Sequence, residues 1–450
     1  MNILVINGSP SGQYSITLQT VRYLEKLNSQ HSFTVLNAAQ TIHTIEKNFE
    51  PSKQKLLEAD LILFCYPVYT FIAPSQIHSF IRLMKECGAD FSGKAVSQIT
   101  TSKHFYDITA HNYVMENCMD MGMNFIQGLS ADMDDILKPK GQKQAQDYFK
   151  HLLWCMENSI FEKPRAHVER TLVHSVSVPT ESVPHKAGKP VVIVQDSTNT
   201  NETLLAMIKR FQAKLPYETK VVDIGTFPMK GGCLGCFHCA ADGKCIYKDG
   251  YEDLLRNEIQ SGASIVYAFN ILDHSMGPRY KMYDDRQFCN GHRTVTSGMP
   301  MGYLITGDLD SEPNLKMIID GRGQVGGNHI AAIATNQSNP EQEVDQLAAC
   351  LSYELENGFA MSPNFLGVGG MKIFRDLIYL MGGMMRADYK FYKKTGIFDD
   401  FPQKQKGTRF KMKLVGMLMN NPKLMAKAGN AMNEGMVGPY RKVIDNVKSE

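Results

Sequence analysis

The chain has 450 residues, of which 43% are hydrophobic and 21% are charged, and its formal net charge is +2. This is the composition of a globular protein, and at about 100–200 residues per domain the length predicts two or three domains. The near-neutral balance gives no overall attraction to nucleic acid. Ten cysteines in so long a chain are too few for a disulfide scaffold.

The N-terminus reads MNILVINGSP and lacks the basic and apolar regions of a secretory signal. The most apolar late stretch, 373–385, is interrupted by Arg375 and Asp376 and is shorter than the roughly 20 residues that a span needs. We therefore expect no membrane span, and a cytoplasmic protein whose thiols stay reduced.

One pattern of strands, loops and helices occurs twice along the chain. Ile3–Ile6 predicts a buried strand, followed by a polar loop and a helix from about Ser15 to Leu27, and Val191–Val194 begins the same succession. The second and third strands of the two copies are expected at 33–36, 59–64, 221–224 and 263–268. Strands that alternate with helices predict α/β domains, each with a doubly wound parallel sheet. The second copy has about sixteen extra residues between its second and third strands.

This repeat predicts the domain boundaries. We expect domains at 1–165 and 190–355, a linker at 166–189, and a helical extension at 356–450. From Met361 onward the extension has 16 Lys and Arg against 7 Asp and Glu, and 11 of the 26 methionines. It is either an appendage packed on the core, or a lid, a dimer arm or a docking face for an acidic electron carrier.

The loop after the first strand predicts a phosphate site. Its hydroxyl groups, on Ser9, Ser11, Ser15 and Thr17, can donate to phosphate oxygens, and the following helix offers free N–H groups and a positive dipole end. The loop has no lysine, so it is not a P-loop and suits a monophosphate better than a triphosphate. The alternative is that Ser15 or Thr17 only caps the helix.

These loops resemble those of a known fold. The segment Gly8–Thr17 is similar to the NADPH-dependent FMN reductase branch of the flavodoxin fold, and Thr198–Thr203 resembles the flavodoxin phosphate loop, with Asn201 where that family prefers Gly. The resemblance covers about 1–160 and 188–355. It implies two tandem flavodoxin-like doubly wound parallel sheets, with a C-terminal helical extension outside the resemblance.

Two further loops of the first copy are similar to the loops that hold the isoalloxazine ring in this family. One follows the third strand and is stiffened by proline; the other follows the next strand and carries a lysine and a histidine that could stabilise charge on a reduced flavin. The resemblance implies an FMN site in the first copy, formed by Ser9, Ser11, Ser15, Ile16, Thr17, Pro67, Val68, Tyr69, Thr70, Thr101, Ser102, Lys103, His104 and Tyr106. The second copy lacks the proline–tyrosine loop, so FMN there stays an open question.

The most specific feature is Cys233-x2-Cys236-x2-Cys239-x5-Cys245. Zinc sites usually join two C-x2-C pairs across a dozen or more residues, whereas three cysteines at this spacing resemble ferredoxin-type ligands of a [4Fe–4S] cluster. The compact form is similar to the iron–sulfur flavoproteins, which pair FMN with such a cluster. Zinc, or free redox thiols, remain alternatives. The other six cysteines are scattered, and we expect them to be buried apolar residues.

Together these patterns predict an FMN-dependent oxidoreductase in which the first copy holds FMN and the second copy a [4Fe–4S] cluster. The electron donor would be NAD(P)H or ferredoxin, and the acceptor a small organic molecule; the copies would pack as an internal pseudo-dimer, and a homo-oligomer is possible. The alternatives are an NAD(P)H-dependent FMN or quinone reductase without a cluster, and a non-catalytic electron-transfer or redox-sensing flavoprotein. No residue stands out as a catalytic acid or base. Gly321–Gly326 fits G-x-G-x-x-G, but it follows a predicted helix rather than a strand, so we reject it as a dinucleotide site.

Overall fold

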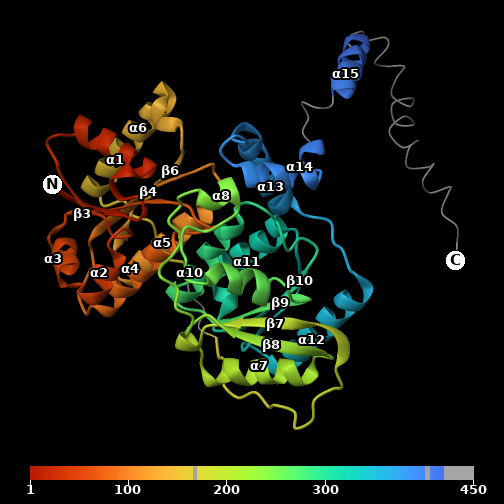
Figure 1. Ribbon diagram of the computed structural model, residues 1–450. Helices are drawn as coiled ribbons and strands as arrows, with labels where there is room; N and C mark the ends of the chain where they lie inside the picture. The colour runs from red at the N-terminus through yellow and green to blue at the C-terminus, as the bar shows by residue number, and fades with distance from the viewer. Residues whose placement is uncertain (166–169, 401–405, 420–450) are drawn as a thin grey trace. The chain divides into compact units, whose positions relative to one another are not determined.

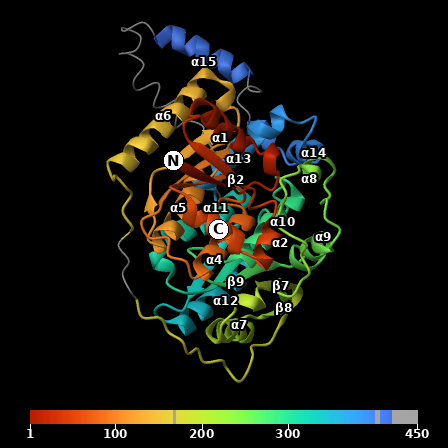
Figure 2. The ribbon, with the colours of Figure 1, turned by 90° about the vertical axis from the view of Figure 1, so that its left-hand side faces the viewer.

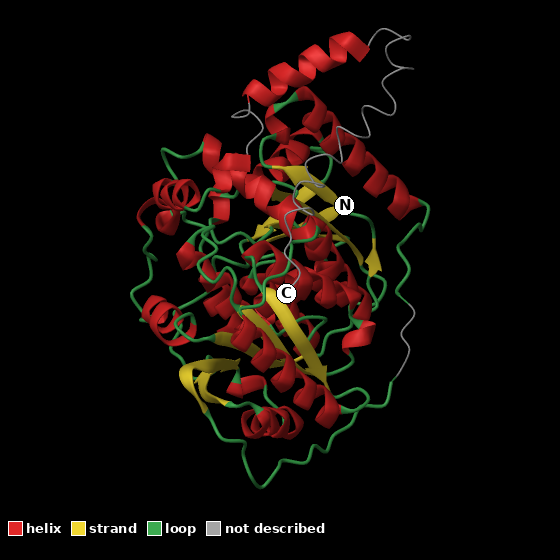
Figure 3. Cartoon of the chain, turned by 90° about the vertical axis from the view of Figure 1, so that its right-hand side faces the viewer, coloured by secondary structure: helices red, strands yellow, loops and turns green. Residues whose placement is uncertain are grey.

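The computed structural model describes residues 1–165, 170–400 and 406–419. Residues 1–389 form one compact unit and residues 390–450 another. The first unit contains two separate sheets, each flanked by helices (Figures 1 and 3). Among the described residues, no helix combines the length and apolar character needed to cross a bilayer.

The first sheet has the strand order β2-β1-β3-β4-β5, and β6 extends the pairing along β4. All these pairs are parallel. Parallel strands covered by helices are buried on both faces, and Ile3 to Ile6 are at most 2% exposed. The elements are β1 (Asn2–Asn7), α1 (Ile16–Leu27), β2 (Ser32–Leu36), α2 (Ile42–Lys47), α3 (Glu50–Glu58), β3 (Leu61–Pro67), α4 (Ser75–Glu86), β4 (Ala95–Ser102), α5 (Asp107–Asp120), β5 (Asn124–Phe125), β6 (Leu129–Asp132) and α6 (Pro139–Glu157).

The second sheet repeats this topology, with the order β8-β7-β9-β10-β11 and every pair parallel. β7 begins at Lys186, earlier than the strand expected at Val191, because Lys186 already pairs with Tyr217. The elements are β7 (Lys186–Gln195), α7 (Glu202–Lys214), β8 (Tyr217–Asp223), α8 (His238–Asp242), α9 (Tyr251–Asp253), a π-helix (Leu254–Ile259), β9 (Ser264–Asn270), α10 (Pro278–Arg286), β10 (Pro300–Thr306), α11 (Pro313–Gly326), β11 (His329–Thr335) and α12 (Pro340–Asn357).

The two halves pack against each other through two pairs of helices, α4 on α10 and α5 on α11 (Figures 1 and 2). Ile318 and Val325 of α11 belong to the same buried cluster as Leu4 and Phe64 of the first sheet. The apolar core is therefore continuous across the two halves, in agreement with the expected internal pseudo-dimer. Such contacts place the loops at the strand ends of one half against the other half.

After α12, the described residues contain the helices α13 (Phe365–Leu380), α14 (Arg386–Lys394) and α15 (Lys406–Met419). Helix α13 packs along α11, and its glycines allow the close approach. A Cβ on Gly370 would lie only 2.6 Å from Val325 and 2.9 Å from Phe105. The start of the extension is thus part of the first compact unit. The expectations for residues 401–405 and 420–450 fall outside the described residues.

Candidate functional site

One cavity of about 310 Å³ lies where the two halves meet, and residues from three parts of the chain line it. The first half contributes its phosphate loop and both ring loops, the second half its cysteine loop, and α13 an apolar wall. The predicted residues in its lining are Ser9, Ser11, Ser15, Ile16, Thr17, Pro67, Val68, Tyr69, Thr70, Thr101, Ser102, Lys103, Cys233, Cys236, Cys239 and Cys245. The sites predicted separately for a flavin and for a metal cluster thus open into the same space.

The loop after β1 brings hydroxyl groups to the start of α1. Ser15 caps that helix, its Oγ accepting from the backbone N–H of Leu18 at 3.3 Å, and the Thr17 hydroxyl lies 2.6 Å from that of Thr101. A Cβ on Gly8 would collide with Ile77 and lie 2.8 Å from Tyr66, so glycine allows the loop to approach these residues closely. This places the loop at the carboxyl end of β1 beside β3, where the 2-1-3-4-5 strand order opens a binding crevice.

The chemistry of the lining fits an anionic nucleotide. No Asp or Glu is among the described residues that line the cavity. The cations of its lining, Lys103, Arg286 and His292, are each paired with a carboxylate outside the lining, so hydroxyl and N–H groups would bind the anion. The Ser102 hydroxyl is buried and has no hydrogen-bond partner among the residues that the structure describes. A buried hydroxyl without a partner costs free energy, and a ligand oxygen in the cavity would remove that cost. The hydroxyls and this unpaired group are therefore suited to FMN.

The ring loop after β3 has an unusual backbone. Thr70 and Phe71 have φ angles of 45° and 73°, in the left-handed region that non-glycine residues seldom adopt. A tight bridge closes the loop, in which the Tyr69 N–H donates to the Ile72 carbonyl at 2.9 Å and the Ile72 N–H donates back at 3.1 Å. A conformation with about 1–3 kcal/mol of strain at such a residue persists only where its surroundings hold it.

The cysteine loop connects β8 to α9 and is fastened by one buried arginine. Arg286 is 1% exposed, donates to both Asp249 carboxylate oxygens at 2.9 Å, and donates to the Gly231 carbonyl at 3.0 Å. Its guanidinium also lies over the ring of Tyr247, 4.3 Å from the centroid. Gly231 precedes the first cysteine and Asp249 follows the last, so a single side chain ties the two ends of the loop together.

The four thiols do not have the spacing of a preformed zinc site. Zn–S bonds of about 2.3 Å place the sulfurs of a tetrahedral site roughly 4 Å apart. Within the described part of the chain, no three of these Sγ atoms lie within 4.8 Å of one another. A multi-iron cluster holds its ligands farther apart than a single ion does. Burial raises the pKa of Cys233, and burial together with the Asp388 charge raises that of Cys239 to about 11, so both thiols are protonated near neutral pH, and a bound metal would deprotonate them.

The cysteine loop lies directly on the ring loop of the other half. A Cβ on Gly235, whose φ is 60°, would collide with the Tyr69 hydroxyl, and one on Gly232 with the Ser75 hydroxyl. The Gln76 side chain donates to the Cys233 carbonyl at 3.4 Å. Glycine at these positions therefore allows the two loops to approach closely, which places the cysteine motif next to the loop that contains Tyr69.

Comparisons with known proteins agree with this architecture. Residues 1–129 match the family model of the flavodoxin-like fold. The first half is a flavodoxin-like domain. The second half repeats its strand order, so the chain contains two flavodoxin-like domains. An iron–sulfur flavoprotein of Archaeoglobus fulgidus is 24% identical over 207 residues, which are 44% of this chain and 93% of that protein.

Two solved structures show low overall similarity. An NADPH-quinone reductase from P. pentosaceus is 16% identical, with a TM-score of 0.27, and the match covers 34% of this chain and 97% of that chain. An NAD(P)H:(acceptor) oxidoreductase from Paracoccus denitrificans is also 16% identical, with a TM-score of 0.30, and covers 35% and 97%.

Two of the residues expected at the flavin do not line the cavity. His104 lies at a different pocket beside β6 and α6, where its Nδ1 is 3.0 Å from Asp107. Tyr106 packs against Phe71 and Gly321, and within the described part of the chain its buried hydroxyl has no hydrogen-bond partner. Lys103 reaches the cavity, but Asp132 and Asp134 hold its ammonium group at 2.8 and 2.9 Å. His104 and Tyr106 adopt the left-handed region and turn the loop away from the cavity. A sequence pattern of strands and loops does not predict such a turn.

The second flavodoxin-like domain uses its own hydroxyls within the loop after β7. Asp196 accepts from the Thr198 N–H at 3.0 Å and from its hydroxyl at 2.6 Å, and Ser197 donates to Asp223 at 2.7 Å. Thr203 donates to the His174 carbonyl at 2.9 Å. Carboxylates at these positions would repel a phosphate, and the loop does not line the cavity. This domain therefore lacks the features that suit the first loop to FMN.

Sequence reasoning missed part of the cavity wall. Cys289, expected only as a buried apolar residue, is buried at 2% exposure and also lines the cavity; burial raises its pKa to about 12. Ile373, Phe374 and Leu377 of α13 close another side. No motif marks these residues, because their place follows from how α13 packs on α11.

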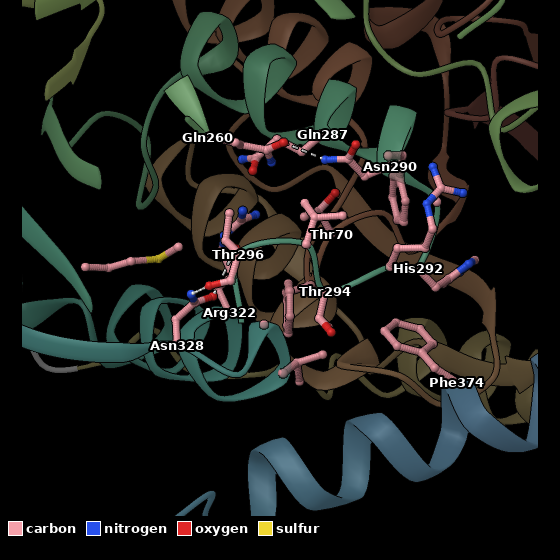
Figure 4. A pocket seen from close by; sticks show the side chains of 18 of the residues that line it. Thr70, Gln260, Gln287, Asn290, His292, Thr294, Thr296, Arg322, Asn328 and Phe374 are labelled. Atoms are coloured by element: carbon pink, nitrogen blue, oxygen red, sulfur yellow. Dashed lines mark hydrogen bonds between the residues drawn. The ribbon is translucent and has the colours of Figure 1, made fainter. Parts of the chain in front are cut away.

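A smaller pocket of about 150 Å³ adjoins the cavity (Figure 4). The two share Thr70, Phe288, His292 and Phe374 in their walls. The described lining of the small pocket includes Arg322 and amide side chains but no carboxylate. It lies between the ring loop of the first domain and the segment 287–296 of the second.

Proposed function

We propose that this protein is a flavin-dependent oxidoreductase that binds FMN in its first domain and a [4Fe–4S] cluster in its second. The observation that supports this most directly is that the phosphate loop, both ring loops and all four cysteines of the motif line the same cavity, whose described lining contains no carboxylate. Flavin exchanges electron pairs or single electrons, and an iron–sulfur cluster exchanges single electrons, so the two cofactors together connect both kinds of chemistry.

The residues of the chain would bind, orient and shield these groups. Ser9, Ser15 and Thr17 would hold the phosphate, with the N-terminus of α1 favouring its negative charge. The ring would lie along the loop that contains Tyr69 and Thr70. The four cysteines would ligate the cluster, and the apolar wall from α13 would exclude water. The similarity to the iron–sulfur flavoprotein of Archaeoglobus fulgidus supports the pairing of a flavin with an iron–sulfur group.

The smaller pocket is our candidate site for a small organic acceptor. A cavity of about 150 Å³ accommodates a single benzene ring. Aromatic walls and hydrogen-bond donors such as Arg322 suit one ring that carries polar oxygens. We propose NAD(P)H or a reduced ferredoxin as the electron donor, and activity in the cytoplasm.

Anaerobic purification followed by quantification of iron, sulfide and flavin tests the proposal. We expect about four iron atoms and one FMN per chain, with broad visible absorbance. Substitution of Ser9, Ser15 and Thr17 by Ala should remove flavin and leave iron, whereas Cys236→Ala should remove iron and leave flavin. Flavin without iron would identify a reductase that lacks a cluster. Loss of both cofactors from either folded variant would contradict the assignment of one cofactor to each domain.

A further inference from the structure

The ring loop of the first domain is held in place by the second domain. Asp285 on α10 accepts from the Thr70 hydroxyl at 3.1 Å and from the Ser75 backbone N–H at 2.7 Å. Lys281, one turn earlier on the same helix, donates to the Tyr69 carbonyl at 3.0 Å and pairs with Asp285. Both side chains are fully buried. The loop and the first N–H of α4 thus take partners from a different domain.

These contacts act on the strained part of the loop. Thr70 and Phe71 adopt the left-handed region, and Asp285 binds the side chain of the first of them. The first domain adds contacts of its own, among them the bond from the Thr109 hydroxyl to the Phe71 carbonyl and the Tyr69–Ile72 bridge. Because each left-handed residue costs about 1–2 kcal/mol, the loop needs several such contacts to keep one conformation.

The same contact occurs a second time, in reverse. Asp273 and His274 of the second domain adopt the same left-handed conformation in the corresponding loop, with φ angles of 53° and 59°. Arg82 is the counterpart of Asp285 in the repeat, and Thr70 that of Asp273, because both pairs have the same separation along the chain. The Arg82 guanidinium lies 3.5 Å from the Asp273 carboxylate across the boundary. Each domain therefore holds the loop of the other, as in an isologous dimer interface. Only the first-domain loop lines the cavity.

We propose that Asp285, together with Lys281, is a positioning residue for the flavin site: it holds the ring loop of the first domain, so that FMN binding depends on the second domain. This rests on the proposed FMN site and adds a cross-domain requirement to it. Nothing in the phosphate loop or the cysteine motif contains this information. It follows from the buried carboxylate and ammonium groups of α10 that contact the loop.

The test uses the full-length chain, with FMN affinity measured by flavin fluorescence on flavin-depleted protein. Asp285→Asn keeps the shape of the side chain and removes its charge, and we expect FMN to bind about tenfold more weakly or worse. The flavin midpoint potential should rise, because the buried Lys281 ammonium, 3.0 Å from the Tyr69 carbonyl, would lose the carboxylate that balances its charge. Thr70→Val removes only the hydrogen bond, and should weaken binding by roughly threefold to tenfold with the potential unchanged.

Asp273→Asn is the matched control, because it removes a carboxylate that contacts the other end of α4 and pairs with Lys85 at 3.2 Å. It should leave FMN affinity and potential as in the wild type. Wild-type affinity and potential in Asp285→Asn, or equal weakening in Asp273→Asn, would overturn the inference while the proposed function stands. A wild-type protein that does not bind FMN would overturn both. If Asp285→Asn does not fold, Thr70→Val provides the test. Unchanged FMN affinity in Thr70→Val would refute the proposal that the second domain positions the ring loop.

Discussion

Replacing Arg286 by Met should release the cysteine loop. The side chain makes two 2.9 Å hydrogen bonds to Asp249 and one of 3.0 Å to Gly231, and the Asp249 carboxylate is 2% exposed. Burial opposes ionisation of Asp249, yet the hydrogen bonds from Arg286 lower its pKa to about 2. Removing the arginine would leave that charge buried and unpaired, which costs about 3–5 kcal/mol.

Because about 1.4 kcal/mol corresponds to a factor of ten, this loss would populate the open loop at least a hundredfold more than in the wild type. The measurement is the rate at which a chelator removes iron, together with the rate at which a thiol reagent labels the iron-free protein. Both rates should rise in Arg286→Met. Arg286→Lys keeps the charge but not the planar fork that binds both oxygens of Asp249, and it should give intermediate rates.

A second arginine of the same domain provides the control. Arg210 is 8% exposed, and its Nε and Nη2 donate to the two carboxylate oxygens of Asp345 at 2.8 Å, between α7 and α12. Arg210→Met should lower the free energy of unfolding without speeding iron release. Wild-type release rates in Arg286→Met, or equally fast release in Arg210→Met, would refute the role assigned to Arg286.

Three further predictions concern other parts of the structure. Gly235→Ala should lower the iron content. Adding Tyr69→Phe should restore it only in part, because the Cζ of residue 69 would still lie 2.9 Å from the new Cβ. Full recovery or no recovery of iron per chain would contradict this. The pKa of His274 is about 10, since carboxylates of both domains outweigh its burial, so its stabilising effect is complete below about pH 6.5 and is lost as the pH rises through 10. Urea unfolding should show that pH dependence in the wild type and not in His274→Gln. Phe374→Ala should enlarge the cavity and increase quenching of bound flavin fluorescence by iodide; unchanged quenching would exclude α13 as its shield.

Much of the site could be predicted from the sequence because it consists of local patterns. A buried strand, a hydroxyl-rich loop and a helix cap lie within Asn2 to Leu27, and the alternation of strands and helices gives parallel sheets whichever partner they meet. The local sequence also excludes Gly321–Gly326 as a dinucleotide site, because a helix precedes the motif. These residues lie inside α11. The cysteine spacing likewise needs only the chain between β8 and α9.

Other features depend on segments far apart in the chain. Whether His104 faces the cavity depends on two left-handed residues, His104 and Tyr106, whose φ angles are 54° and 53°. The polar residues of a loop sequence do not indicate which of them adopt the left-handed conformation. Asp285 looks like one acidic residue of an ordinary helix until α10 is placed against the ring loop.

The sequence by itself determined that there are two α/β copies, which loop carries hydroxyls and which carries four cysteines, since each of these is encoded within about thirty neighbouring residues. Only the tertiary structure decided that these loops share one cavity and that α13 closes it. Only the tertiary structure decided that each domain holds the other's strained loop. The physical reason is that many of these contacts join residues far apart in the chain, 157 positions in the case of Gln76 and Cys233. The burial of apolar helix faces brings such residues together, and a sequence pattern does not show which polar groups will then meet.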